Sequence, residues 1–188
     1  CISMALTPMV LTARLEKKKH PGSKVVFIGP CAAKKLEASR ANIRSDVDFV
    51  ITFEELQGMF EAKDIKFEEL EDGEPLLEGT GAGRGFAVAG GVAQAVADVI
   101  HRWHPDMEVK VAHAEGLREC RKLLTMARAG KYNGYLLEGM GCPGGCVGGA
   151  GTIRPINKSA ELVARYKKEA PEQNALDSKY ESVLPTLD

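Results

Sequence analysis

Four short apolar runs alternate with longer segments of helical periodicity along the chain. The apolar runs cover residues 24–28, 48–52, 108–113 and 134–138, and the helical segments cover 8–20, 32–39, 53–62, 89–103, 117–129 and 158–169. Strands that are joined by helices of about a dozen residues pair in parallel through right-handed crossovers. The alternation therefore predicts an α/β fold with a parallel four-stranded sheet flanked by helices.

Local sequence signals set several of these boundaries. Thr7 followed by Pro8 is typical of a helix start, and Thr52 with Glu55 predicts a capping box at the start of another helix. The run 24–28 shows no alternation with polar residues, so we expect a strand that is buried on both faces. The acidic, weakly periodic stretch 63–79 predicts a surface excursion.

Composition narrows the classes of partner. The 188 residues are 44% hydrophobic and 27% charged, which suits one globular domain or a large piece of one. A formal net charge of -1 gives no electrostatic reason to expect nucleic acid or an anionic membrane as partner. No apolar run approaches the roughly 20 residues of a membrane span, and the N-terminus lacks the layout of a signal peptide. We therefore expect a cytoplasmic protein, and because the first residue is Cys1 rather than Met, we expect residues 1–188 to be a piece of a longer chain.

The cysteines lie beside predicted strands. Five cysteines, an odd number, argue against a disulfide framework and for metal or redox chemistry. Cys31 follows the first predicted strand and Cys142 follows the fourth, and the carboxyl ends of parallel strands face one crevice. Cys146 joins them through Pro143-Gly144-Gly145, which gives three thiols from two loops.

Three soft ligands suit zinc or an iron–sulfur cluster better than a hard cation. Structural zinc usually shows two close pairs of ligands, and the chain has no second pair. The glycines beside Cys142 and Cys146 favour the cluster, because peptide N–H groups can approach and hydrogen-bond the sulfurs. Lys34 and Lys35 add positive charge within a turn of Cys31. A fourth cluster ligand is then missing.

Two of these segments carry a specific resemblance. Residues 29–37, GPCAAKKLE, resemble the second cluster-binding signature of the iron-only hydrogenases, commonly written MPCxxKxxE. Residues 138–149, EGMGCPGGCVGG, resemble the third signature, ExMxCPGGCxxGG, and the glycines at 81–83 and 90–91 resemble the family's glycine-rich stretch before a helix. The order also agrees, so the resemblance covers nearly the whole chain. It implies the C-terminal portion of that family's H-cluster domain, as one lobe of it.

By this resemblance the chain would hold part of the H-cluster, a 4Fe–4S cubane that one cysteine bridges to a di-iron subcluster carrying carbonyl, cyanide and dithiolate ligands. Cys31 and Cys142 would be cubane ligands, and Cys146 would bind the cubane and bridge to the di-iron unit. Lys34 would hydrogen-bond a cyanide, and Met140 would pack against the di-iron unit. The other residues expected at the cofactor are Glu37, at a position linked in the family to proton transfer or to structure, Pro30, Gly144 and Gly145.

The function that the resemblance implies belongs to the full-length parent. That parent is expected to be a hydrogenase-type oxidoreductase that oxidises dihydrogen reversibly to protons and electrons, with ferredoxin-like domains or another electron carrier as partner. The isolated piece is expected to be inactive and to lack an intact cluster, because one ligand and one wall of the pocket lie in the rest of the parent chain.

Departures from the family pattern keep two alternatives open. The first signature, TSCCPxW, does not occur in the chain, and Leu6 stands where catalytic members have lysine. Gly29 and Gly141 stand where methionine and alanine are common. Such changes resemble a sensory branch of the family, whose members report hydrogen or redox state with little turnover. The other alternative is an iron–sulfur protein that holds only the cubane, like the eukaryotic relatives in cluster assembly.

Other candidate residues carry weaker signals. Cys120 lies in an amphipathic helical pattern and is expected to pack in the core. His101 and His104 lie three apart near a helix end, where we expect them to cap carbonyls. The glycines from 79 to 85 match neither a dinucleotide fingerprint nor a P-loop, so we expect Arg84 to be a structural or cluster-proximal cation.

Overall fold

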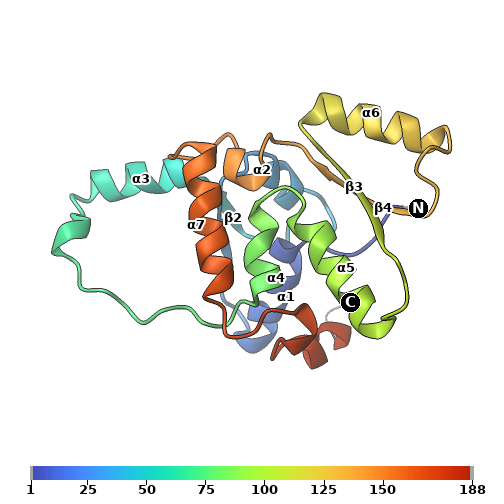
Figure 1. The fold of residues 1–188 in the computed structure, drawn as a ribbon. Coiled ribbons are helices and arrows are strands. Elements are labelled where there is room, and N and C mark those ends of the chain that lie inside the picture. Colours follow the sequence, from blue (N-terminus) through green and yellow to red (C-terminus); the bar gives the residue numbers. More distant parts are fainter. Residues whose placement is uncertain (1, 187–188) are drawn as a thin grey trace. The chain divides into compact units, whose positions relative to one another are not determined.

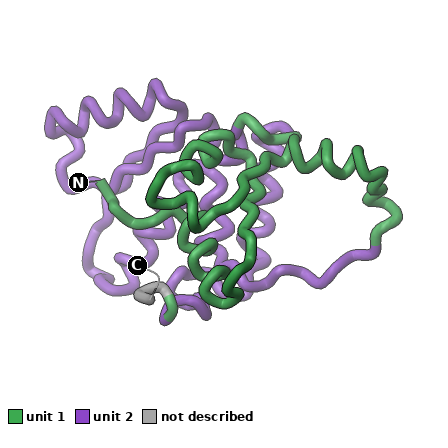
Figure 2. The backbone as a smooth tube through the Cα atoms, turned by 180° about the vertical axis from the view of Figure 1, so that it is seen from behind, with its two compact units in different colours: residues 1–70, 150–153, 183–188 green, residues 71–149, 154–182 purple. Residues whose placement is uncertain are grey.

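The computed structural model describes residues 2–186 (Figure 1) and divides the chain into two compact units. Unit 1 comprises the described residues of Cys1–Leu70, Ala150–Ile153 and Val183–Asp188, and unit 2 comprises Glu71–Gly149 and Arg154–Ser182 (Figure 2). The chain passes between the units more than once, so neither is one continuous stretch.

Unit 1 contains two short strands and three helices. In chain order these are α1 (Pro8–Lys19), β1 (Val26–Ile28), α2 (Ala33–Ala38), β2 (Phe49–Ile51) and α3 (Phe53–Ala62), followed by a 3-10 turn at Phe67–Glu69. The strands pair in parallel, with Phe27 opposite Val50. The core forms where α1 meets the segment between α2 and β2, and its buried side chains are Met9, Val10, Ala13, Ile43 and Val47.

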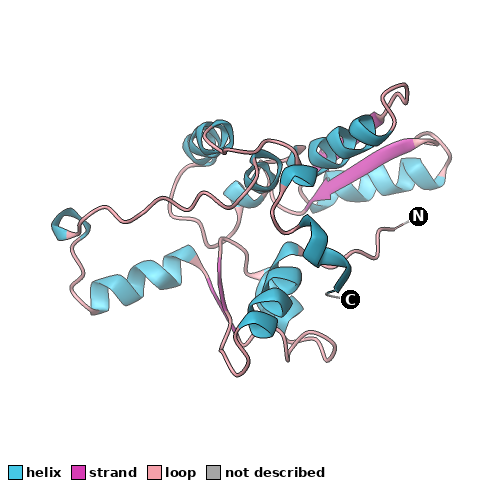
Figure 3. Ribbon diagram, turned by 90° about the horizontal axis from the view of Figure 1, so that it is seen from below, coloured by secondary structure: helices cyan, strands magenta, loops and turns pink. Residues whose placement is uncertain are grey.

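Unit 2 contains a longer strand pair and four helices. In chain order these are α4 (Gly81–Arg84), α5 (Gly91–Trp103), β3 (Lys110–Glu115), α6 (Leu117–Arg128), β4 (Tyr135–Met140) and α7 (Ile156–Lys168). β3 and β4 pair in parallel from Lys110 opposite Tyr135 to Glu115 opposite Met140. α6 packs along this pair, and α4 packs on α5 and α7. Figure 3 shows the strands in magenta among the cyan helices.

Two predicted helix starts differ in their chemistry. The capping box at α3 is confirmed, because Glu55 N–H donates to Thr52 Oγ1 at 3.1 Å and Thr52 N–H donates to Glu55 Oε2 at 2.8 Å. Thr7 precedes α1 with Pro8 in the first turn, but its hydroxyl caps no backbone group of that helix. The hydroxyl instead donates to Glu37 Oε1 at 2.6 Å. A long-range partner has therefore replaced the local cap.

The α/β class and the parallel pairing are confirmed, whereas the single four-stranded sheet is not. The described residues form two separate two-stranded ladders, β1–β2 and β3–β4. Each ladder joins strands that are consecutive in the chain and linked by one helical crossover, while the long segment 52–109 separates β2 from β3. The expected burial of β1 on both faces is also wrong, because Val26 and Ile28, which share one face of the strand, are 47% and 43% exposed.

The stretch 63–79 is the predicted surface excursion. All its residues are exposed, and its one regular element is the turn at Phe67–Glu69. No helix in the described part of the chain combines the length and the apolar character that a membrane crossing requires.

Candidate metal centre

Cys31 lies in the loop that leaves β1. Gly29 N–H still donates to Ile51 O at 3.1 Å, so the strand pairing extends one residue into this loop. The Pro30 carbonyl accepts from Gly151 N–H at 3.0 Å, which fastens segment 150–153 of the same unit beside the cysteine. Cys31 itself is half-buried and in no disulfide. α2 starts at Ala33, one residue after the start that the sequence predicted.

Lys34, Glu37 and Thr7 form one hydrogen-bonded group beside this loop. Lys34 Nζ donates to Glu37 Oε2 at 2.5 Å, and Thr7 Oγ1 donates to Glu37 Oε1. The Lys34 and Glu37 side chains are 22% and 16% exposed, respectively. Burial by itself raises the pKa of Glu37, but the hydrogen bonds from Lys34 and Thr7 and the charges of Lys34 and Arg40 outweigh it, so the pKa is lowered. Glu37 is therefore an anion that orients the Lys34 ammonium.

We expect Glu37→Gln to lower the free energy of unfolding by about 1 kcal/mol at neutral pH, because it loses these charge-assisted hydrogen bonds. The pKa of Glu37 is depressed in the folded chain. Its contribution is therefore complete above the unfolded pKa, about 4.3, and is lost as the pH falls through the folded pKa. Denaturant unfolding at neutral pH and at acid pH below the folded pKa measures this, with the exposed Glu68→Gln as control. An equal difference at both pH values would contradict the assignment.

Cys142 and Cys146 lie in the loop that leaves β4. Gly145 N–H donates to Cys142 O at 3.1 Å, and Gly149 N–H donates to Cys146 O at 2.9 Å, so both cysteine carbonyls are bonded within the loop. Gly144 and Gly145 have φ angles of 77° and 91°, in the left-handed region that favours glycine. Both cysteines are half-buried. The loop therefore has a defined local conformation.

The glycines of this loop also meet the segment before α5. Ala89 N–H donates to Gly144 O at 3.1 Å, and a Cβ added at Gly145 would lie 2.5 Å from Ala89 N and 2.9 Å from Ala87 O. Gly144 N–H donates to Glu115 Oε2 at 2.7 Å. The N–H groups of Gly144 and Gly145 thus donate to protein acceptors. The sequence predicted that they would donate to the cluster sulfurs. The sequence indicated glycine here, but packing against residues 87–89 supplies a further physical reason.

Met140 ends β4 just before the loop. Its carbonyl accepts from Gly116 N–H at 2.8 Å and from the Cys120 thiol at 3.3 Å, and its side chain is half-buried. Cys120 also donates to Ala114 O at 3.5 Å. The sequence predicted that this thiol packs in the core. It is half-buried, and its hydrogen bonds join α6 to the ends of both strands of the ladder.

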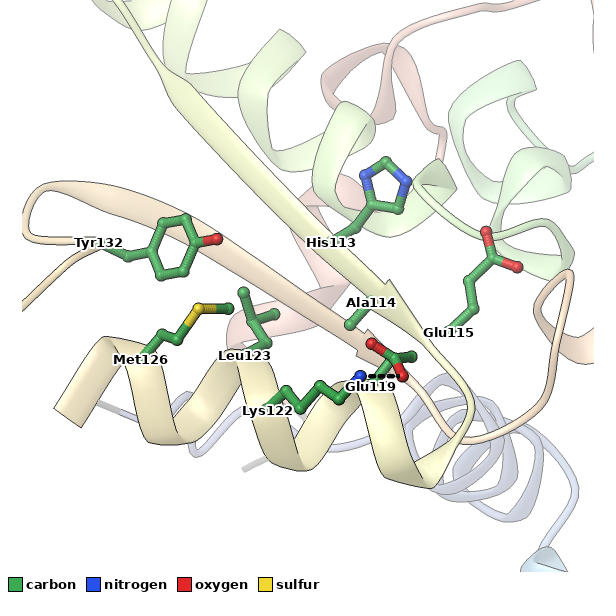
Figure 4. A pocket seen from close by; sticks show the side chains of 8 residues that line it. All are labelled: His113, Ala114, Glu115, Glu119, Lys122, Leu123, Met126 and Tyr132. Atoms are coloured by element: carbon green, nitrogen blue, oxygen red, sulfur yellow. Dashed lines mark hydrogen bonds and ion pairs between the residues drawn. The ribbon is translucent and has the colours of Figure 1, made fainter. Parts of the chain in front are cut away.

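A pocket of about 370 Å³ lies between β3 and α6 (Figure 4). Glu119 is directed at Lys122, with a distance of 2.8 Å between Oε1 and Nζ. Glu115 also lines the pocket and accepts from Gly144 in the cysteine loop.

Sequence reasoning missed Glu115 and Glu138, although Glu138 is the first residue of the third signature and is a charged residue at the end of an apolar run.

Arg84 holds the end of the surface excursion within unit 2. Its guanidinium donates to the carbonyls of Gly79, Leu76 and Tyr166 and lies 3.9 Å from the centroid of the Tyr166 ring. This agrees with the structural cation expected from the sequence.

Of His101 and His104, the second is the C-cap residue of α5, where its backbone N–H donates to Ile100 O at 2.7 Å.

The candidate residues divide between the two units. Cys31, Pro30, Lys34 and Glu37 belong to unit 1, and the residues of unit 2 are Met140, Cys142, Gly144, Gly145 and Cys146. Within residues 2–186 the structure gathers no group of three or more histidine, cysteine, aspartate or glutamate side chains that could hold a metal ion. The donor chemistry nevertheless fits an iron–sulfur group, because all three expected ligands are soft thiols on loops that directly follow strands.

Comparisons with known proteins indicate the family of the chain. The family model described as "Iron only hydrogenase large subunit, C-terminal domain" matches residues 1–150. The periplasmic Fe hydrogenase large subunit of Nitratidesulfovibrio vulgaris is 31% identical over 171 residues, which cover 72% of this chain and 41% of that protein. A probable cytosolic Fe-S cluster assembly factor of Aedes aegypti is 27% identical over 215 residues, which cover 87% of this chain and 45% of that protein. The chain thus spans less than half the length of these curated relatives.

The fold matches as well. An apo variant of the FeFe-hydrogenase HydA1 from Chlamydomonas reinhardtii superposes with a TM-score of 0.63 at 22% identity, over 96% of this chain and 64% of that one. At this identity the likeness concerns the fold alone, whereas the family model covers most of the sequence. The chain belongs to the family of the iron-only hydrogenase large subunit, C-terminal domain.

Proposed function

We propose that the chain is the C-terminal, cluster-binding portion of the H-cluster domain of an iron-only hydrogenase. The longer protein would oxidise dihydrogen reversibly to protons and electrons. The observation that carries this proposal is the pair of cysteine loops, one leaving β1 with Cys31 and one leaving β4 with Cys142 and Cys146, in a chain of this family.

In this proposal Cys31, Cys142 and Cys146 would hold the 4Fe–4S cubane, and Cys146 would also hold the di-iron subcluster. When bound, the H-cluster supplies the metal site at which dihydrogen is cleaved or formed and the path by which electrons leave. Met140 would pack at the di-iron unit. Pro30, Gly144 and Gly145 would line the cofactor.

Few residues separate Cys146 from the segment that is fastened beside Cys31. Gly151 N–H donates to the carbonyl of Pro30, the residue before Cys31, inside unit 1. Gly151 follows Cys146 by five residues, and five residues of extended chain span at most about 18 Å. This covalent tether supports a single cluster that draws ligands from both loops.

Lys34 and Glu37 have separate roles in the proposal. Lys34 would present an ammonium to an anionic ligand of the di-iron unit, which suits a compact cation. Glu37 holds Lys34 Nζ at 2.5 Å and is held in turn by Thr7, so it orients the cation. Glu37 also offers a carboxylate through which a proton can pass.

The proposed setting is the cytoplasm, with a ferredoxin-like electron carrier and the rest of the parent chain as partners. The name of the Aedes aegypti relative supports that compartment, while the relative from Nitratidesulfovibrio vulgaris is named as periplasmic. The net charge of -1 supports no role for nucleic acid.

A sensor of hydrogen or redox state is the second candidate, and the packing at Gly29 favours it. A Cβ at this position would lie 2.8 Å from Cε1 of the Phe27 ring, so the ring occupies the space that a larger side chain needs. Gly29, which replaces the methionine of the family pattern, thus leaves room for the Phe27 ring. Leu6, in place of the lysine of catalytic members, favours the same candidate.

Infrared spectroscopy of the full-length parent, matured with the di-iron subcluster, tests the proposal. We expect carbonyl and cyanide bands that change when hydrogen is added. Absence of these bands after maturation would remove the enzyme and the sensor together and leave a cubane-only protein. If the bands appear, hydrogen uptake with a dye acceptor separates the first two, because rapid turnover counts against sensing as the main role.

A further inference from the structure

Glu138 is the one charged residue that is buried among those the structure describes. It lies on β4 with 8% of its surface exposed. Its carboxylate accepts three backbone N–H groups: Gly90 at 2.5 Å to Oε2, and Val92 and Ala93 at 3.1 and 3.4 Å to Oε1. A buried carboxylate needs such donors to offset its lost hydration.

All three donors lie at the start of α5. The first N–H groups of a helix have no partner inside it, and an acceptor with negative charge there is favoured by the helix dipole. Gly90, the N-cap residue, has a φ angle of 85° and caps nothing with a side chain of its own. Glu138 therefore fastens the start of α5 to β4, two residues before that strand ends at Met140.

The segment just before α5 touches the cysteine loop. Ala89 N–H donates to Gly144 O, and the absence of a side chain at Gly145 lets the backbone of residues 87–89 approach closely. From the end of β3, Glu115 accepts the N–H of the same Gly144. Two carboxylates thus hold the loop, Glu138 through the start of α5 and Glu115 directly.

We infer that Glu138 and Glu115 are positioning residues that hold the Cys142–Cys146 loop in one conformation before any cluster binds. This pair is called the carboxylate clamp. A loop with four glycines between residues 141 and 148 loses much conformational freedom on ordering. A clamp built into the apoprotein bears that cost during folding, so cluster binding does not have to order the loop. The inference rests on the proposed function only where it concerns the cluster.

Amide hydrogen exchange of the 188-residue apoprotein tests the clamp without a cluster. In Glu138→Gln one acceptor oxygen becomes a donor, and we expect exchange at Val92, Ala93 and the 142–148 loop to accelerate about tenfold. In Glu115→Gln we expect a similar acceleration confined to the loop, which keeps the inference testable if the first variant does not fold. Glu108→Gln, an exposed carboxylate of the same unit, should change neither. Unchanged exchange in the loop in both clamp variants would overturn the inference.

A second readout concerns the cluster in the matured parent. We expect Glu138→Gln and Glu115→Gln to release iron to a chelator about tenfold faster than the wild-type protein and to shift the reduction potential of the cubane, because both change groups that position its ligands. A purely structural role far from the cluster would leave the potential unchanged. If the wild-type parent binds no iron, the proposed function fails while the exchange experiment still decides the clamp. Release rates and potentials equal to wild type in both variants would show that the clamp does not act on the cluster.

Discussion

Gly145→Ala is expected to destabilise unit 2 by roughly 2–5 kcal/mol and to abolish cluster retention in the matured parent. The residue has a φ angle of 91°, where a Cβ is unfavourable by about 1–2 kcal/mol. The added methyl group would also meet the backbone of Ala87 and Ala89 at 2.5–2.9 Å. Backbone atoms cannot rotate away as a flexible side chain can, so the loop and the start of α5 must separate. Denaturant unfolding and iron content measure the two effects.

Gly134→Ala is the matched control for this change. Gly134 has a φ angle of 77°, but an added Cβ would meet no atom within 4 Å. This variant should therefore lose only the backbone contribution, about 1–2 kcal/mol, and should keep its iron. Equal losses of stability in the two variants would show that contact with residues 87–89 is not what requires glycine at position 145.

Local patterns predicted the elements whose energetics are local. The apolar periodicity of α5 and α6 and the Thr52–Glu55 capping box placed these helices to within about two residues. The short helix α4 was missed because three of its four residues are Gly81, Ala82 and Gly83, which read as a turn. Its start is nevertheless capped, since Thr80 Oγ1 accepts from Gly83 N–H at 3.1 Å.

Contacts between distant segments were beyond such patterns. Glu138 and Gly90 are 48 residues apart, and no local spacing signals that one accepts from the other. The same holds for Thr7, which the sequence assigns to its own helix and the structure assigns to Glu37, 30 residues away. The cysteine loops could be placed after their strands because local sequence shows where along the chain a strand ends. The acceptors that hold them in shape depend on tertiary structure.

The three proposed cysteine ligands can be tested by replacing each of them with serine. Cys31→Ser, Cys142→Ser and Cys146→Ser, each made in the matured parent, are expected to lower its iron content about tenfold or more, because a hydroxyl is a harder and more weakly binding ligand than a thiolate. Serine nearly preserves the size of cysteine, so the fold should survive. Iron content and the visible absorption of the cubane measure the loss.

Cys120→Ser is the control that separates ligation from packing. The Cys120 thiol donates to carbonyls of Ala114 and Met140 beside the same loop, and a serine hydroxyl can make these hydrogen bonds. The Cys120→Ser variant should therefore leave the iron content within twofold of wild type, although Cys120 contacts the end of the strand that leads to Cys142. Full iron in Cys31→Ser together with loss in the other two would contradict a cubane shared between both cysteine loops, because the site would then need only the loop that leaves β4.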